Sequence, residues 1–448
     1  MGVVTRARKK RKLEEEQEFV DDFISGLPDG VLGDIVTLLP TRDGARTQVL
    51  SSRWRHIWRS APLNLDLQKP LRHTPARDFS RVLSSHPGPG RRFTIDMRYV
   101  LSRDSAPLEL EAWLRCPAMD SLQELEFHLG RPFEFPPLLP ASLRRFSCTL
   151  RVASFGACSF PDGNANALHL PLLNQLSLVS VRISETSLHA LLAGCSVLES
   201  LLLEDTNGFP RVQIMSTSLR SIGVCSPWGD DRLTQLIIED APSLERLLIF
   251  GGREMDISVI SAPRLHILGE LQGRGQMLRF GATALQGSTV ASLTTVVPSV
   301  RALALSHMTP CLDVAINLIK CFPLLEKLHV EITHDREENT SSDKYQEPIG
   351  TLDIRLRKIV LAYLNDREPD IEFAKFFVMN ASMLESMTLE FIGSDAWIRR
   401  QRRLLQVEKR ASKGARFDFV SRNRSFSLPR AKQVHEMLIL DPFQRVRR

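Results

Sequence analysis

The sequence predicts an α/β fold in which a short N-terminal block of three helices precedes a long, irregular solenoid of parallel strands. Two observations predict this fold. Apolar residues recur with helical spacing between residues 27 and 60, and a six-residue leucine pattern repeats from about residue 120 to about residue 390. With 448 residues, 43% of them hydrophobic, the chain can bury a large core in more than one structural unit.

The first predicted helix, in LPDGVLGDIVTLLP (residues 27–40), has two apolar stripes. One stripe consists of Leu32, Ile35, Val36 and Leu39, and the second of Val31, Ile35 and Leu38. Pro28 suits the first turn of this helix, and Pro40 ends it. Two stripes indicate two contacts. One lies within the block, and the other is made either with the repeats that follow or with another protein.

Two further helices are predicted between residues 41 and 60. Val49 and Leu50 belong to the apolar face of the second, and Trp54 and Trp58 lie one turn apart on the third. Three short helices in about 40 residues rarely bury enough apolar surface to be stable alone. The sequence therefore predicts that the block packs against a further surface.

The repeated pattern is LxxLxL, with other apolar residues allowed at its three fixed positions. Its eleven occurrences begin at residues 122, 143, 173, 198, 219, 244, 265, 300, 325, 356 and 384. Intervals of 21 to 35 residues are typical of leucine-rich repeats, in which one unit cannot bury its apolar face but a stack can. We expect an uneven horseshoe with parallel strands on its concave face and helix-like segments on its convex face.

These patterns divide the chain into six segments. They are a disordered basic and acidic arm (1–20), the helical block (21–62), a linker and solenoid entry (63–92), the repeats (93–345), a stretch that continues the solenoid (346–420) and a basic tail (421–448).

The net charge of +6 is unevenly distributed. Residues 1–12 hold six Lys or Arg and no acid, and residues 399–448 hold fifteen against four acids, so the body between them carries about −11. An acidic body argues against nucleic-acid binding there. The basic run Lys9, Lys10, Arg11 and Lys12 fits either a nuclear-import signal or a solvated charged tail, and we expect the protein in the nucleus, the cytoplasm or both.

Catalytic and cofactor motifs are missing from the sequence. It contains no Walker A loop, no GxSxG and no HExxH, and its eleven histidines are dispersed. The seven cysteines show no metal-ligand spacing, which favours a reduced intracellular compartment, and Cys195 is interpreted as a buried thiol. With no apolar run of about 18 residues, no membrane span is expected. We expect no enzyme, no cofactor and no metal.

The helical block resembles an F-box. The resemblance is carried by LPD, the apolar helix, LPTRD, VLSSRWRHIWRS and the short strand LNLDL. It implies that the block docks onto the adaptor of a cullin-based SCF ubiquitin ligase. By this resemblance the adaptor contacts are Leu27, Pro28, Leu32, Ile35, Leu39 and Pro40, while Val49, Leu50, Trp54 and Trp58 complete the interface or the packing behind it. Gly30, Gly33 and Gly44 depart from the family, which more often has helix-favouring residues there.

The C-terminal part resembles the FBD segment of plant F-box/leucine-rich-repeat proteins. The stretch from LRKIVL to LESMTLEF and the closing RRQRRLLQVEKRASKGARFDF carry this resemblance. It implies a non-catalytic substrate-recognition subunit whose partners are the adaptor, through it a cullin, and an unidentified protein substrate. A ubiquitin-independent scaffold and a nucleic-acid-binding protein acting through the basic tails are the alternatives.

Substrate contacts are expected on the concave face, at strand positions between the leucines. They are Ser200, Leu202, Glu204, Arg246, Leu248, Phe250, Lys327, His329 and Glu331. Leu202, Leu248 and Phe250 are unusually apolar for an exposed strand face. Either packing buries them or they line a hydrophobic recognition pocket.

Overall fold

The computed structural model describes residues 24, 26–67, 76–97, 106–130, 136–162, 168–225, 233–249, 255–272, 277–281, 283–286, 289–292, 296–334, 353–365, 367–391 and 395–421. The predicted import run at residues 9–12, the predicted face residue Phe250 and the segment 422–448 lie outside this description.

Three α-helices and one 3-10 turn make up the N-terminal block. They are α2 (Asp29–Leu38), α3 (Thr41–Arg46), η1 (Thr47–Val49) and α4 (Ser52–Ser60). Pro28 and Pro40 precede α2 and α3, where a missing N–H leaves no helix hydrogen bond unmade. Ser51 caps α4, because its Oγ accepts a hydrogen bond from the Trp54 N–H.

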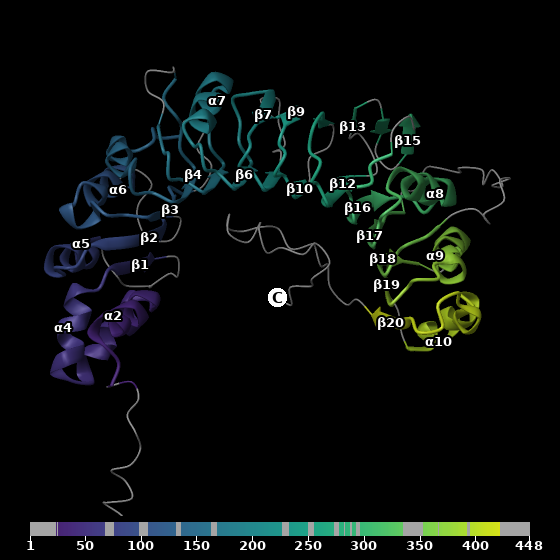
Figure 1. Ribbon diagram of the computed structural model, residues 1–448, viewed down its shortest axis with the longest axis horizontal. Helices are drawn as coiled ribbons and strands as arrows, with labels where there is room; N and C mark the ends of the chain where they lie inside the picture. Colours follow the sequence, from purple (N-terminus) through teal and green to yellow (C-terminus); the bar gives the residue numbers. More distant parts are fainter. Residues whose placement is uncertain are drawn as a thin grey trace, which may run out of the picture.

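A single sheet of fourteen parallel strands runs through the described residues and bends into an arch, with the helices outside it (Figure 1). In order, its strands are β1 (Leu63–Leu67), β2 (Gly90–Asp96), β3 (Glu124–His128), β4 (Val152–Gly156), β5 (Gln175–Val179), β6 (Ser200–Glu204), β8 (Ser221–Cys225), β10 (Arg246–Ile249), β12 (Ile267–Gln272), β16 (Ala302–Met308), β17 (Lys327–Ile332), β18 (Lys358–Leu364), β19 (Ser386–Phe391) and β20 (Arg416–Ser421). Strands that follow one another along the sheet follow one another along the chain, as a leucine-rich-repeat stack requires.

Alternate residues of each strand point into one continuous core. In β6, Leu201 and Leu203 are at most 1% exposed, and Leu198, the first leucine of the pattern, is 2% exposed. The same cluster of buried apolar side chains extends from Leu32 of the helical block to Ala415 beside β20. The helical block and the repeats therefore share a hydrophobic core.

The structure adds detail to one predicted segment and corrects one predicted repeat. The segment 63–92, interpreted as linker and solenoid entry, contains β1, α5 (Ala76–Ser85) and the start of β2, so the sheet begins within it. The predicted repeat LRRFSC at residue 143 is instead the 3-10 helix η3 (Ala141–Phe146). Arg145 donates hydrogen bonds to Leu114 O and Asp120, which holds this segment away from the sheet. The repeat strand is β4, with Leu150, Ala153 and Phe155 at its fixed positions.

The convex side is also less helical than predicted. Helices there are α6 (Ala106–Leu114), η2 (Pro117–Met119), α7 (Glu185–Ala193), α8 (Leu312–Cys321), α9 (Glu368–Asn380), α10 (Asp395–Leu404) and η6 (Val407–Lys409). Between α7 and α8 a second sheet replaces helices, formed by β7 (Arg211–Met215), β9 (Gln235–Asp240), β11 (Asp256–Val259), β13 (Met277–Phe280), β14 (Thr283–Gln286) and β15 (Thr289–Ser292). Sequences such as RVQIM alternate between exposed and buried residues, which is the strand period.

Charges of alternating sign line the turn that leads into each strand. The second residue of the leucine pattern is hydrogen-bonded through its backbone to the equivalent residue of the preceding repeat, as in Glu245 N–H to Arg220 O. The side chains pair along the same column: Arg220–Glu245 and Arg301–Glu326 at 2.8 Å, and Arg357–Glu385 at 3.1 Å. Exposed pairs are each worth only about 0–1 kcal/mol, but the alternation favours one order of neighbouring repeats.

Candidate functional site

Helix α2 directs one apolar stripe to the core and the other to solvent. Leu32 and Val36 are at most 1% exposed and belong to the shared core. Val31, Ile35 and Leu38 are 42%, 40% and 76% exposed. Because the first stripe already anchors the helix, the second is available to a partner.

Further apolar side chains of the block are exposed in the chain before and after this helix. Val49 and Leu50, at the end of η1, are 85% and 64% exposed, and Ile24 before α2 is 56% exposed. We call the six side chains the exposed apolar set: Ile24, Val31, Ile35, Leu38, Val49 and Leu50. An accumulation of this kind on a short segment is typical of a protein-binding surface.

The ten predicted adaptor contacts differ in accessibility. Pro28, Ile35, Pro40, Val49 and Leu50 are exposed, Leu27 and Leu39 are half-buried, and Leu32, Trp54 and Trp58 are buried. A direct contact by Leu32 is therefore wrong, since its side chain is 0% exposed and packs in the core. The two tryptophans, 8% and 7% exposed, lie in the packing behind the surface, which was one of their two predicted positions.

Val31 and Leu38 were missing from the predicted contacts although they lie on the second stripe. The sequence shows both stripes of α2 equally well. What it does not show is which stripe faces the core, because this depends on where β1 and α4 pack against the helix. The prediction therefore included Leu32 from the stripe that the fold buries.

Gly44 makes room for the ring of Trp58. A Cβ at position 44 would lie 2.4 Å from a ring carbon of Trp58, whereas a Cβ at Gly30 or Gly33 would meet nothing within 4 Å. Trp58 in turn packs edge-on against His86, with ring centroids 4.9 Å apart. Of the three glycines that depart from the F-box pattern, only Gly44 is required by packing.

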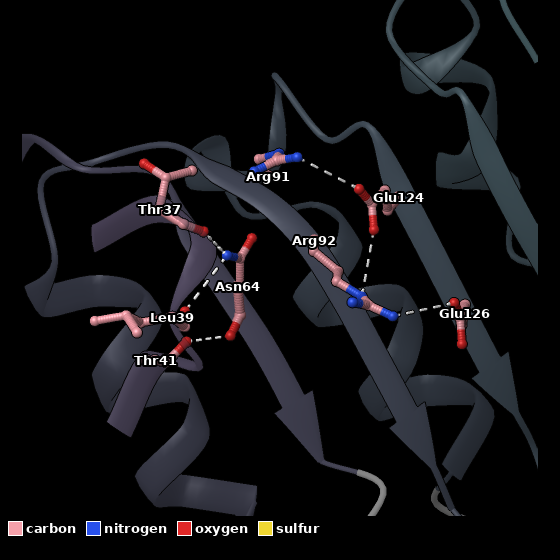
Figure 2. A network of polar contacts seen from close by, with 8 residues as sticks. All are labelled: Thr37, Leu39, Thr41, Asn64, Arg91, Arg92, Glu124 and Glu126. Carbon is pink, nitrogen blue, oxygen red and sulfur yellow. Dashed lines mark hydrogen bonds and ion pairs between the residues drawn. The ribbon is translucent and has the colours of Figure 1, made fainter. Parts of the chain in front are cut away.

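Asn64 of β1 fastens the block to the sheet (Figure 2). Its Nδ2 donates to the carbonyl oxygens of Thr37 and Leu39 at the end of α2, and its own carbonyl accepts from Thr41 Oγ1 at the start of α3. Asn64 thereby satisfies backbone groups that the end of a helix leaves unpaired. The exposed apolar set is thus held in a fixed position relative to the sheet.

A charged cluster lies next to Asn64 on the neighbouring strands (Figure 2). Arg92 of β2 lies 3.3 Å from Glu124 and 3.5 Å from Glu126 of β3, and Arg91 lies 3.7 Å from Glu124. The sequence alone does not reveal this cluster, because its members become neighbours only through the strand register Arg92–Glu124.

The concave face contains every predicted substrate residue that the structure describes. Ser200, Ser221 and Arg246 are in register across β6, β8 and β10, and Leu202, Gly223 and Leu248 form the next row. Lys327, His329 and Glu331 occupy the same face of β17, and Glu204 ends β6, while Phe250 lies outside the described residues.

Accessibility on this face differs from residue to residue. Ser200, Leu202, Leu248 and His329 are 0%, 1%, 3% and 8% exposed, while Glu204, Arg246, Lys327 and Glu331 are half-buried. Leu202 and Leu248 form a small cluster with Cys225 that is separate from the main core. We call these three residues the concave cluster.

A polar cluster joins the end of β17 to α9. His334 Nε2 is 2.8 Å from Asp370 Oδ2, which also accepts the Asn365 N–H at 2.7 Å, and Asn365 Nδ2 is 3.1 Å from His334 Nδ1. Asp370 is 1% exposed, and both hydrogen bonds go to its Oδ2, while the buried Oδ1 has no hydrogen-bond partner among the described residues. The arrangement connects two repeats.

Burial raises the pKa of the Cys195 thiol to about 12, so it is protonated at neutral pH and a poor nucleophile. Within the described ranges, no group of three or more His, Cys, Asp or Glu could hold a metal ion. None of the helices in those ranges is long and apolar enough to cross a membrane.

Comparison with known proteins finds similarity to F-box and leucine-rich-repeat proteins. A family model for the leucine-rich repeats of FBD-associated F-box protein At5g56370 matches residues 110–330. Three Arabidopsis thaliana relatives are similar. F-box protein At5g03100 is 27% identical over 55% of this chain and 69% of its own length. The putative F-box/FBD/LRR-repeat proteins At5g22610 and At4g00315 are 28% and 30% identical, over 55% and 52% of this chain and 52% and 54% of their own lengths.

These similarities support a plant F-box/leucine-rich-repeat protein. The family match begins in α6 and ends in β17, so it lies within the repeats and does not include the helical block. The chain spans about half the length of most of the curated relatives that it matches.

Proposed function

We propose that this protein is the substrate-recognition subunit of an SCF-type ubiquitin ligase. Its helical block is then an F-box that docks onto an SKP1-type adaptor, and through it a cullin, while its repeats form a horseshoe that recruits a protein for ubiquitination. One observation carries the proposal. The block shares the core of the repeats through one stripe of α2 and leaves a second apolar stripe exposed.

The adaptor interface is built on the exposed apolar set. Leu38, Val49 and Leu50 are the most exposed of its residues, and burying each of them in an interface would contribute about 1.5–3 kcal/mol. Pro28 and Pro40 flank α2 and add rigid apolar surface. Leu32, Trp54 and Trp58 support this surface from behind.

The role in ubiquitination is non-catalytic, as it is for F-box/leucine-rich-repeat proteins in general. Holding a target near the charged ubiquitin-conjugating enzyme raises the effective concentration of the target lysine. The half-buried charged residues of the concave face, Glu204, Arg246, Lys327 and Glu331, are the substrate contacts that we propose. They could pair with charges on a protein segment lying across the strands.

Co-purification of the adaptor with full-length variants tests the proposal. Val49→Asp and Leu50→Asp each place a charge on an exposed position, so the fold should be retained while adaptor recovery falls at least tenfold. Leu108→Asp, at a 75% exposed position on α6, is the matched control and should recover the adaptor like the wild type. Equal recovery from all proteins, or none from the wild type, would refute the adaptor role.

We also propose a nuclear and cytoplasmic location. The basic run at residues 9–12 supports nuclear entry through its charge alone. A fluorescent fusion of the full chain should lose nuclear signal when Lys9, Lys10, Arg11 and Lys12 are all changed to Ala. An unchanged distribution would show that this run is not a nuclear-import signal.

A further inference from the structure

The two ends of the large sheet are covered differently. At the first end, the helical block packs against β1, where Asn64 binds the end of α2 and the start of α3. At the other end lies β20, whose one strand neighbour among the described residues is β19 (Figure 1). A solenoid needs a cap at each end, because the terminal repeat otherwise exposes the side that its next neighbour would cover.

Two phenylalanines of β20 indicate that this end is open. Phe417 and Phe419 pack against the main core but stay partly exposed. Their register partners in β19, Met387 and Leu389, are 0% and 1% exposed. A further strand beside β20 would cover the two rings in the way that β20 covers β19.

The backbone of β20 has an unpaired row of polar groups along its outer edge. The Arg416 N–H donates to Glu385 O at the start of β19, so the backbone groups of Arg416 face β19. Because successive residues of a strand alternate in direction, the N–H and C=O groups of Phe417 and Phe419 face away from the sheet. These groups have no hydrogen-bond partner among the described residues. Such an edge is a template for one more strand.

Basic side chains lie beside this edge. Residues 400–416 hold seven Lys or Arg against one acid, Glu408. Arg410 donates to the carbonyl oxygens of Val407 and Lys413, and Arg416 pairs with Asp418 at 2.9 Å. The other five are exposed and make no ion pair within the described ranges, and we call them the basic rim: Arg400, Arg402, Arg403, Lys409 and Lys413.

The basic rim belongs to the same end of the molecule as β20. The guanidinium carbon of Arg402 lies 5.0 Å from the ring centroid of Phe419. Lys409 and Lys413 lie in the turn that leads from α10 into β20. In the earlier repeats, Arg220, Arg301 and Arg357 each have a glutamate partner on the neighbouring turn. The rim lacks such partners in the described part of the chain, so it favours an anionic partner.

We propose that β20 binds an acidic, extended segment of a partner protein, which adds one more strand to the large sheet. The backbone of this segment pairs with the outward-facing groups of Phe417 and Phe419. Its carboxylates contact the basic rim, and apolar side chains on one of its faces cover the two rings. Strand pairing supplies affinity, and charge selects the sequence of the segment.

Backbone and charge together favour a protein segment over other anions. A nucleic acid or an anionic lipid surface matches the charge of the basic rim but has no row of peptide groups to pair with β20. A second copy of this chain has such a row, but pairing β20 with β20 would bring two basic rims together. The surface lies at the opposite end of the sheet from the exposed apolar set, so the proposal does not depend on the adaptor role and the two tests can fail separately.

Fluorescence anisotropy with the full-length protein tests the surface. The probe is a labelled peptide in which Glu alternates with Val over the length of β20, with further Glu at both ends. It should bind saturably, and Arg400→Glu combined with Arg403→Glu should weaken binding at least tenfold. Arg211→Glu combined with Arg279→Glu makes the same charge change at exposed positions of β7 and β13 and should leave the affinity unchanged.

Three further probes separate strand pairing from charge attraction. A peptide with Lys in place of Glu should not bind. The acidic peptide with every backbone amide N-methylated keeps its charge but loses its N–H donors, so it should bind at least tenfold more weakly. An oligothymidylate of equal charge should also bind more weakly. No saturable binding of the acidic peptide, equal affinity for its N-methylated form, or tighter binding of the oligothymidylate would each overturn the proposal.

Hydrogen exchange in the wild-type chain avoids any effect of the variants on folding. With the acidic peptide bound, exchange of the Phe417 and Phe419 amides should slow at least tenfold. The Asp418 and Val420 amides face β19 already and should change little. Fragmentation mass spectrometry resolves these neighbouring positions. Unchanged exchange at Phe417 and Phe419, or equal slowing at all four amides, would contradict pairing along the outer edge of β20.

Discussion

Two apolar surfaces of this protein differ in what happens to them in the isolated chain. The exposed apolar set of the helical block stays open, with Leu38 76% exposed, whereas Leu248 on the concave face is 3% exposed. Both surfaces lie on elements whose other face packs into the same core. The first is available to a partner, and the second is shielded from solvent in the folded chain.

This difference separates two steps of the proposed function. Adaptor binding through an open surface needs no rearrangement of the chain. Substrate binding on the concave face would use the side chains that remain partly accessible there, such as Arg246 and Lys327. Substitutions on the two surfaces should therefore have different consequences.

The largest effect is expected within α2, where the two stripes can be compared directly. Leu32→Ala should lower the free energy of unfolding by about 2–5 kcal/mol, because it removes a fully buried side chain. Ile35→Ala, one turn away on the exposed stripe, should change it by at most about 0.5 kcal/mol. Urea unfolding of both variants measures the difference, and similar losses would mean that the stripes are not distinct.

Adjacent residues of β10 provide the second comparison. Leu247→Ala should cost about 2–5 kcal/mol of unfolding free energy, since Leu247 lies in the main core. Leu248→Ala should cost about 1–2 kcal/mol, since Leu248 belongs to a cluster of three buried residues that is separate from the main core. Losses of equal size in thermal and urea unfolding would place Leu248 in a core as rigid as that around Leu247.

Two glycines of the helical block should respond with opposite sign. Gly44→Ala should lower stability by about 1–3 kcal/mol, because its Cβ would overlap the Trp58 ring. Gly33→Ala should raise stability by about 0.4–1 kcal/mol, because the position is helical and open. Differential scanning fluorimetry resolves the sign, and stabilisation by Gly44→Ala would contradict the packing described for Trp58.

The smallest effect is expected from the charge column on the turns. A double-mutant cycle on Arg220 and Glu245, each changed to Ala, should give a coupling of about 0.2–1 kcal/mol. Salt at 1 M should remove most of it, because the pair is exposed. A coupling that persists in high salt would mean that the pair acts through packing rather than charge.

Features that depend on a short stretch of sequence could be predicted, and features that depend on contacts between distant segments could not. The repeat strands were predictable, because Leu198, Leu201 and Leu203 and their equivalents must all be apolar to fill the core. The strand β4 was not predictable. Its leucine pattern has the small Ala153 at one fixed position, so it matches the repeat less well than LRRFSC, which begins seven residues earlier. Short convex strands such as β11 carry too few residues to establish a period.

The candidate site was only partly predictable for a related reason. Both stripes of α2 are visible in the sequence, but the choice between Leu32 and Leu38 as the exposed one is made by packing against distant strands and helices. The cluster of Arg92, Glu124 and Glu126 depends on register between β2 and β3, which the spacing of 34 residues does not encode. The burial of Leu202 and Leu248 in one cluster likewise depends on the register between β6, β8 and β10.

Calorimetric titration of a purified SKP1-type adaptor into the full-length protein tests whether the open stripe of α2 docks the adaptor. We expect saturable binding with a negative heat-capacity change, a loss of affinity of at least tenfold for Leu38→Asp, and unchanged affinity for Leu138→Asp, which lies at an exposed position outside the helical block. Wild-type affinity in the Leu38→Asp protein would contradict this expectation, because the open stripe of α2 would then have no part in docking.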